Sequence, residues 1–153
     1  MTIQDVFSSL EGEWKGTNRL NISFLPDPIF ESPSTAKAVK RMNGQCLEIA
    51  YTWVYEGGHH EGVILITGSG KDNSVSAFWT DSWHSKYVLM ECKGTISGED
   101  VINLMGHYSV PGHPDWGWRT EIVPGSDTFK YLMFNVSPEG EEDWAVVTVF
   151  ERA

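Results

Sequence analysis

Short stretches in which apolar and polar residues alternate follow one another along most of the chain. They recur at a spacing of roughly 8–12 residues, and Gly, Pro or Asn punctuates the gaps, which is typical of a β-sandwich or a β-barrel. No helical stretch of crossover length separates them, which argues against parallel βαβ units. We predict an all-β fold of about ten antiparallel strands closed into a barrel, because closure removes the edges that aromatic-rich strands would expose.

The alternation places the expected strands at defined ranges. Pro26, Pro28 and Pro33 predict a long loop after the first strand, and Asn43-Gly44 is a strong hairpin signal. The ranges are 14–24, 36–41, 47–55, 62–67, 75–83, 87–93, 101–110, 118–123, 128–136 and 143–152.

One short helix is predicted before these strands, over residues 2–10. Thr2 and Asp5 have the spacing of a capping box. The apolar residues of this segment fall on one face at helical spacing: Ile3, Val6, Phe7 and Leu10. In a β-protein, a single helix of this length is suited to plugging one open end of the barrel.

A Gly-x-Trp step at Gly12 and Trp14 follows the helix. Gly12 permits a sharp backbone turn, and the Trp14 indole can cover the closed floor of the barrel. Arg152 stands on the expected last strand. An Arg stacked on a Trp is worth about 0.5–2 kcal/mol, so we expect these three residues to close the barrel by joining its first and last strands.

Composition narrows the possible partners and the compartment. The 153 residues suit a single domain over 1–153, and the formal net charge of −10 argues against nucleic-acid binding and against an anionic membrane surface. The two cysteines have no metal-site spacing, and neither a signal peptide nor an apolar run of membrane-spanning length is found. We expect an acidic cytoplasmic protein, a monomer or a homodimer, with no metal and no cofactor.

Three stretches together resemble the domain-of-unknown-function family numbered 1579, among the calycin-like barrels. The first stretch is residues 10–16, and the second is residues 70–85, with Phe-Trp-Thr-Asp-Ser at 78–82. The third is residues 119–152, in which the closing strand ends at an Arg. The resemblance spans nearly the whole chain and implies a closed antiparallel barrel with a central cavity. It implies little about activity.

A more distant likeness is to lipocalins, to fatty-acid-binding proteins and to nitrobindin-like haem barrels. The haem-binding relatives ligate iron with a His near the C-terminal strands, whereas no His follows His113 here, which argues against haem in that mode. Fatty-acid binders hold a carboxylate with inward Arg and Tyr. Arg119 and Tyr131 are the candidates for that role.

Several aromatic residues share one side of their strands and are candidates to line a cavity. Tyr51 and Trp53 belong to one such row, and Trp79 belongs to another. Buried Tyr and Trp need partners for their O–H and N–H groups, which a ligand or water could supply; the alternative is an ordinary packed interior. If Trp14 and Arg152 both face inward, period two also places the alternate residues of the last strand inward: Trp144, Val146, Thr148 and Phe150.

Asp81 shares its side of the strand with Trp79 and Trp83. Desolvation would raise the pKa of an inward Asp, as happens at functional sites; the alternative is that Asp81 accepts hydrogen bonds from the turn that follows it. His107 is a candidate for acid/base chemistry, with Asp81 as the only partner we assign to it; the alternative is a hydrogen-bonded structural histidine.

Two further histidine-containing segments are interpreted structurally or left open. Adjacent strand residues point to opposite faces, so His59-His60-Glu61 is interpreted as a solvated hairpin tip and not as a metal site. Residues 110–118 hold two prolines and two tryptophans, and they predict a loop that is a lid, a subunit contact or a local anchor.

No nucleophile elbow, phosphate loop or zinc-protease motif is present in the sequence. Three hypotheses remain open. The first is a binder of a small hydrophobic ligand in the barrel interior, with Tyr51, Trp53, Trp79, Asp81, His107, Arg119 and Tyr131 as candidate contacts. The second is an enzyme on the same barrel that uses Asp81, His107 or Tyr51, and the third is a dimerising module with a filled core.

Overall fold

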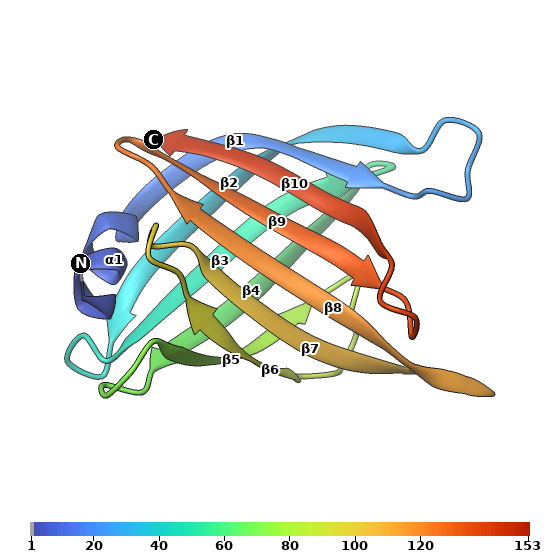
Figure 1. Cartoon of the computed structure of the whole chain (residues 1–153). Helices are drawn as coiled ribbons and strands as arrows, with labels where there is room; N and C mark the ends of the chain where they lie inside the picture. The colour runs from blue at the N-terminus through green and yellow to red at the C-terminus, as the bar shows by residue number, and fades with distance from the viewer. Residues whose placement is uncertain (1) are drawn as a thin grey trace.

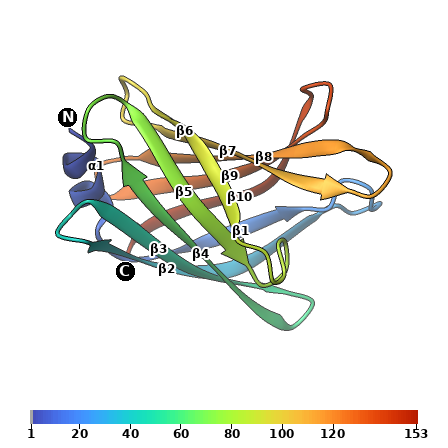
Figure 2. The same ribbon diagram turned by 90° about the horizontal axis from the view of Figure 1, so that it is seen from below.

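A computed structural model describes residues 2–153 as a closed antiparallel barrel with one short helix at one end (Figure 1, Figure 2). The strands are hydrogen-bonded in the order β1-β10-β9-β8-β7-β6-β5-β4-β3-β2, and β2 pairs with β1 to complete the ring. This confirms the predicted fold class. The elements are α1 (Ile3–Leu10), β1 (Gly12–Asn21), β2 (Ile29–Arg41), β3 (Cys46–Tyr55), β4 (Gly58–Gly68), β5 (Ser74–Asp81), β6 (Met90–Ile96), β7 (Ile102–Val110), β8 (His113–Pro124), β9 (Thr128–Val136) and β10 (Glu142–Arg152).

The helix α1 covers one end of the barrel, at the left of Figure 1. Its first turn is fixed by the expected capping box, in which Thr2 and Asp5 exchange backbone-to-side-chain hydrogen bonds. The helix buries three apolar side chains at this end of the barrel: Val6, Phe7 and Leu10. Within residues 2–153, no helix has both the length and the apolar character required to cross a bilayer.

The ring closes where β1 meets β10. Trp14 pairs with Arg152, and the guanidinium carbon lies 3.9 Å from the centre of the indole ring. Arg152 also donates to two backbone carbonyls of the helix end, Glu11 O at 2.6 Å and Ser9 O at 2.8 Å. Gly12 has φ +131°, and a Cβ there would stand 2.6 Å from Arg152 Nη1. This glycine therefore supplies both the turn and the space for the guanidinium.

The strand β2 begins earlier than expected and contains Pro33. Pro33 pairs with β1, whereas the ladder between β2 and β3 begins only at Ala36, so the proline interrupts no ladder on that side. Side chains bridge the two strands instead: Ser34 Oγ donates to Thr52 O at 2.7 Å, and Val54 N donates to Ser32 Oγ at 3.1 Å. The predicted loop through Pro33 is therefore wrong.

The expectation that Trp144 faces inward is also wrong. A β-bulge lies between Trp144 and Val146 in the pairing of β10 with β9, and it buries both Ala145 and Val146. Because the extra residue reverses the alternation, Trp144 lies on the outer face, where the Arg19 guanidinium stands 5.5 Å from its ring.

Residues 110–118 form the tip of a long hairpin and the first part of β8, and not a loop. β7 runs to Val110 and β8 begins at His113, with Gly112 at φ +76° in the turn. Pro114 is tolerated because β8 pairs with β9 only from Gly117 onward, which leaves this end of the strand unpaired on one side.

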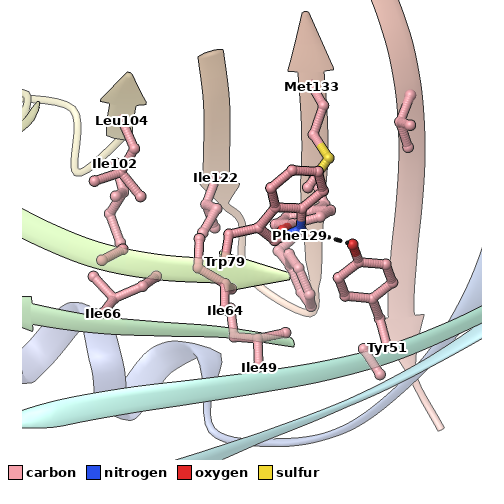
Figure 3. Packing of buried hydrophobic residues seen from close by; sticks show 14 of the residues in the cluster. Ile49, Tyr51, Ile64, Ile66, Trp79, Ile102, Leu104, Ile122, Phe129 and Met133 are labelled. Carbon is pink, nitrogen blue, oxygen red and sulfur yellow. Dashed lines mark hydrogen bonds between the residues drawn. The ribbon is translucent and has the colours of Figure 1, made fainter. Parts of the chain in front are cut away.

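The interior has two chemically different halves. Near α1 it is apolar, with aliphatic side chains such as Ile49, Ile66 and Leu104 (Figure 3) and the packed rings of Trp14 and Phe129. Toward the other end, called here the mouth, the inward side chains also include polar groups. The buried polar residues are Asn18, Ser32, Ser34, Asp81, Thr120 and Thr148.

Candidate functional site

Three neighbouring strands place Tyr51, Gly62 and Asp81 side by side. Tyr51 pairs with Gly62 across β3 and β4, and Gly62 pairs with Asp81 across β4 and β5. A Cβ on Gly62 would overlap the Tyr51 ring. The missing side chain lets the ring lie across β4, so that the Tyr51 hydroxyl donates to Asp81 Oδ2 at 2.7 Å. The same hydroxyl accepts from Trp79 Nε1 at 2.9 Å (Figure 3).

Asp81 ends β5 and is 2% exposed. Besides the Tyr51 hydroxyl, Oδ2 accepts from Trp53 Nε1 at 3.2 Å. Oδ1 accepts from the backbone nitrogens of Trp83 at 2.8 Å and His84 at 3.0 Å, and contacts His84 Nδ1 at 3.3 Å. Asp81 therefore faces the interior and also accepts hydrogen bonds from the turn that follows it.

The expectation that the pKa of Asp81 is raised is wrong. Burial by itself raises the pKa of this carboxyl, but the hydrogen bonds from His84 and the backbone donor of Trp83 outweigh burial and lower the pKa to about 2. Asp81 is ionised at neutral pH. Burial raises the pKa of both Tyr51 and Tyr131 well above its ordinary value, so both are neutral phenols.

His84 is the residue that sequence reasoning missed. It lies in the loop between β5 and β6, and its side chain is 10% exposed. Its ring centre stands 5.3 Å from that of Trp53, 5.2 Å from that of Trp118 and 4.8 Å from that of Trp83. The available signal was a strand-ending Asp followed three residues later by His, where a turn brings the two side chains together.

Several buried polar atoms near this network have no hydrogen-bond partner within residues 2–153. His84 Nε2 is one, and Trp118 Nε1, Thr120 Oγ1 and Tyr131 Oη are the others. Trp118 and Thr120 are successive inward residues of β8, and Tyr131 lies on neighbouring β9 with its ring centre 5.2 Å from that of Tyr51. Buried polar groups are normally satisfied, so this concentration on one side of the interior is informative.

The described interior carries one full charge. Asp81 is the only buried Asp or Glu of residues 2–153, and none of the buried residues is Lys or Arg. His84 is the only basic side chain that contacts the Asp81 carboxylate within that range. The site therefore has no fixed cation to hold an anionic guest.

A hollow of about 580 Å³ opens at the mouth. Its inward wall includes Tyr108, Trp116 and Asn135, and Tyr108 Oη donates to Asn135 Oδ1 at 2.6 Å. Trp118 pairs with Asn135 and is the next inward residue of β8 after Trp116, so this mouth hollow ends beside the polar network. Its rim is acidic and includes Glu141, Glu142 and Asp143.

Two other hollows lie on the outside of the barrel. One, of about 1040 Å³, runs over β2 to β5 and is lined by charged side chains such as Lys37, Glu48 and Lys86, and also by Tyr51 and Asp81. The other, of about 370 Å³, borders an apolar outer patch. The outer patch comprises Met42, Leu65, Phe78 and Leu89, which are 67%, 42%, 52% and 69% exposed.

Two candidate site residues face away from the interior. His107 is exposed on β7, on the face opposite to that of the buried residues Leu104 and Gly106. Arg119 lies on the outer face of β8, bound by Glu121 at 2.8 Å and Glu142 at 2.6 Å. Neither can meet Asp81 or a guest in the interior, so the pairing of Asp81 with His107 and the carboxylate-holding role of Arg119 are wrong.

The remaining histidine-rich segment also contributes to packing. His60 faces inward and packs on Trp53 with ring centres 4.9 Å apart, while His59 is exposed. No cluster of three or more His, Cys, Asp or Glu in residues 2–153 has the arrangement of a metal site.

Comparisons with known proteins identify the family. Residues 3–152 match the family described as a protein of unknown function (DUF1579), and the chain belongs to that family. Rv2717c from M. tuberculosis has a similar structure, with a TM-score of 0.69, 14% identity and coverage of 100% of this chain and 98% of that one. The S-type phycobiliprotein lyase CPES from Guillardia theta is similar at a TM-score of 0.58, 10% identity, and coverage of 100% and 93%. No curated protein sequence matches.

Proposed function

We propose that this DUF1579 barrel binds a small, uncharged, largely apolar molecule in the mouth half of its interior. The observation that carries the proposal is the group of buried polar atoms without partners beside the ordered Asp81 network. An unsatisfied buried donor or acceptor costs about 1–3 kcal/mol, and a guest with one polar group would satisfy several of these atoms at once.

The space at the mouth supports this proposal. Ligand pockets usually measure about 300–1,000 Å³ and combine apolar walls with a few polar groups, and the mouth hollow of about 580 Å³ falls in that range. Below it the interior is closed, because Trp53, Trp79 and Tyr131 are at most 2% exposed. Entry therefore requires the loop that carries Trp83 and His84 to move, and Trp83 is only half-buried.

Charge favours a neutral guest over a fatty acid. The buried residues include ionised Asp81 but no Lys or Arg, and the rim of the mouth hollow is acidic. A carboxylate brought there would be desolvated without a cation to meet it, which is costly. The structural likeness to a phycobiliprotein lyase, at 10% identity, shows the fold alone, so the proposal rests on the chain's own residues.

The test uses the indole N–H resonances of the ¹⁵N-labelled protein. Indole, naphthalene, 2-naphthol and octanoate are titrated in turn, and the Trp118→Phe and Trp144→Phe variants assign the resonance of the inward and of the outer indole. We expect the neutral compounds to shift the Trp118 resonance and leave Trp144 unmoved, because Trp144 lies outside beside Arg19. Titrations in which no compound moves Trp118, with no small molecule retained in native mass spectra of protein from its own host, would overturn the proposal.

A second candidate function, self-association, is favoured by the outer patch. Leu65 and Phe78 pair directly across β4 and β5 and are both exposed. Arg41 and Glu48 border the same patch, and a rim that carries both signs is compatible with a second copy of itself in a two-fold interface. Light scattering should then show a concentration-dependent dimer that Phe78→Glu abolishes and Val149→Glu, on exposed β10, does not. A wild-type chain that stays monomeric at the highest attainable concentration contradicts this candidate.

A further inference from the structure

His84 presents a hydrogen-bond acceptor to the barrel interior. Asp81 is ionised, so both of its oxygens only accept, and the Nδ1 atom of His84 at 3.3 Å from Oδ1 must be the donor. A neutral imidazole with its proton on Nδ1 has only a lone pair on Nε2. That nitrogen is buried and has no partner, so the interior offers an oriented acceptor.

Trp118 presents a donor from the neighbouring wall. An indole Nε1–H can only donate, this one is buried without a partner, and its ring centre lies 5.2 Å from that of His84. The hydroxyls of Thr120 and Tyr131 are also unpartnered, and each can act as a donor or as an acceptor. A guest that suits this pair must combine a donor and an acceptor in one small group. A hydroxyl combines the two, whereas a carboxylate only accepts and an ammonium only donates.

The surrounding rings favour a flat guest. Trp79 and Trp118 are stacked with centres 5.1 Å apart at 14°, and Trp53 lies at 35° to the His84 ring. Aromatic rings prefer stacked or edge-on partners at such separations. The half-buried Trp83 indole stands edge-on over His84 with centres 4.8 Å apart, where its displacement would open the site.

Resting on the proposed function, we propose that the guest is a phenol or a similar aromatic hydroxyl compound. Its O–H donates to His84 Nε2, its oxygen accepts from Trp118 Nε1, and its ring lies among the surrounding indoles. Asp81 is a positioning residue that holds the His84 tautomer. The acidic rim of the mouth hollow and the absence of Lys and Arg from the described buried residues suit the neutral form of a phenol.

Calorimetric titration of the intact chain with three matched probes tests this proposal. 2-Naphthol has the hydroxyl, 2-methoxynaphthalene keeps the oxygen but not the donor, and naphthalene has neither. We expect 2-naphthol to bind roughly tenfold or more tightly than the other two, because leaving a buried acceptor unpaired is costly. His84→Phe should remove the difference among the probes, whereas His107→Phe, on the outer face, should leave it intact.

A measurement on the wild-type chain keeps the test independent of how the variants fold. In ¹⁵N spectra of the histidine rings, the free protein should show His84 protonated on Nδ1, and 2-naphthol should shift its Nε2 resonance while that of His107 stays fixed. Equal affinity for all three probes would overturn the phenol inference and leave the proposed function standing. Failure of all three to bind would overturn the phenol inference, and would overturn the proposed function as well if native mass spectra also show no retained small molecule.

Discussion

The ionised Asp81 inside the barrel makes a specific prediction about stability and pH. The carboxylate is 2% exposed and is held by hydrogen bonds from Tyr51, Trp53, Trp83 and His84. These donors favour the charged form in the folded chain and are absent from the unfolded one. Protonating the carboxyl should therefore cost the folded state more than the unfolded state.

The magnitude follows from the pKa of Asp81. It is lowered from the ordinary value of 3.8 to about 2, and each tenfold change in an ionisation constant is worth roughly 1.4 kcal/mol. The ionised form thus contributes about 2 kcal/mol to the free energy of unfolding. Because the folded pKa is the lower one, this contribution is fully present above pH 4 and is lost as the pH falls toward 2, with about half of it gone near pH 3.

Urea unfolding of the wild type and of Asp81→Asn, between pH 7 and pH 3, measures this effect. The difference in unfolding free energy between the two proteins should shrink by about 1 kcal/mol over that interval, since the wild type approaches the uncharged state of the variant. Asp115→Asn, on the exposed end of β8, is the control and should be within about 0.5 kcal/mol of the wild type at neutral pH. A pH-independent difference, or a carboxyl carbon resonance of Asp81 that titrates above pH 4, would refute the reasoning.

Three further predictions concern packing, barrel closure and thiol reactivity. Gly62→Ala should lower the free energy of unfolding by roughly 1–3 kcal/mol because its Cβ would overlap the tyrosine ring opposite, whereas Gly98→Ala, with open space around it, should be nearly neutral in the same urea titration. Arg152→Ala should cost about 0.5–2 kcal/mol from its stacking on Trp14, plus the loss of two carbonyl contacts; an unchanged urea midpoint would contradict this. Cys92 should react with a disulfide reagent at pH 8 far more slowly in the native chain than in urea, because burial, with the nearby Glu91 charge, raises the pKa of its thiol to about 11; equal rates would be the contrary result.

The barrel itself was predictable because its signals are local and repeated. Period-two alternation located all ten strands, and the absence of crossover helices required antiparallel pairing. The placement of Gly12, Trp14 and Arg152 at the two ends of the chain indicated where the ring closes. Capping residues and apolar spacing indicated a helix at 2–10, and the structure has it at Ile3–Leu10.

The errors in orientation have two different causes. For Trp144 the cause is a bulge, which depends on how β10 packs against β9 and has no clear local signature. For His107 and Arg119 the signal was present, because each is out of phase with the buried apolar residues of its strand, Leu104 on β7 and Trp118 on β8. Arg119 also stands two residues before Glu121, which indicated a solvent-facing ion pair.

The chemistry of the site could be predicted only in part. The sequence placed Tyr51, Trp53, Trp79 and Asp81 on shared strand faces, and the structure joins these four in one hydrogen-bonded network. The sequence did not indicate the direction of the shift in the pKa of Asp81, because the donors that lower this pKa come from a turn whose geometry is not periodic. His84 was missed for the same reason.

The buried Asp81–His84 pair bears on function because stability alone does not account for it. A buried carboxylate with its partners recovers at best the desolvation it costs, and well-packed apolar side chains of similar volume often serve a core equally well or better. The helix half of this barrel is built in that way, from side chains such as Ile49, Ile66 and Leu104. The mouth half instead holds a charge, orients an imidazole with it and leaves Nε2 unpartnered. Perturbed groups arranged in this manner cluster at functional sites. The half of the interior near α1 therefore stabilises the fold, and the mouth half is available for recognition of a guest.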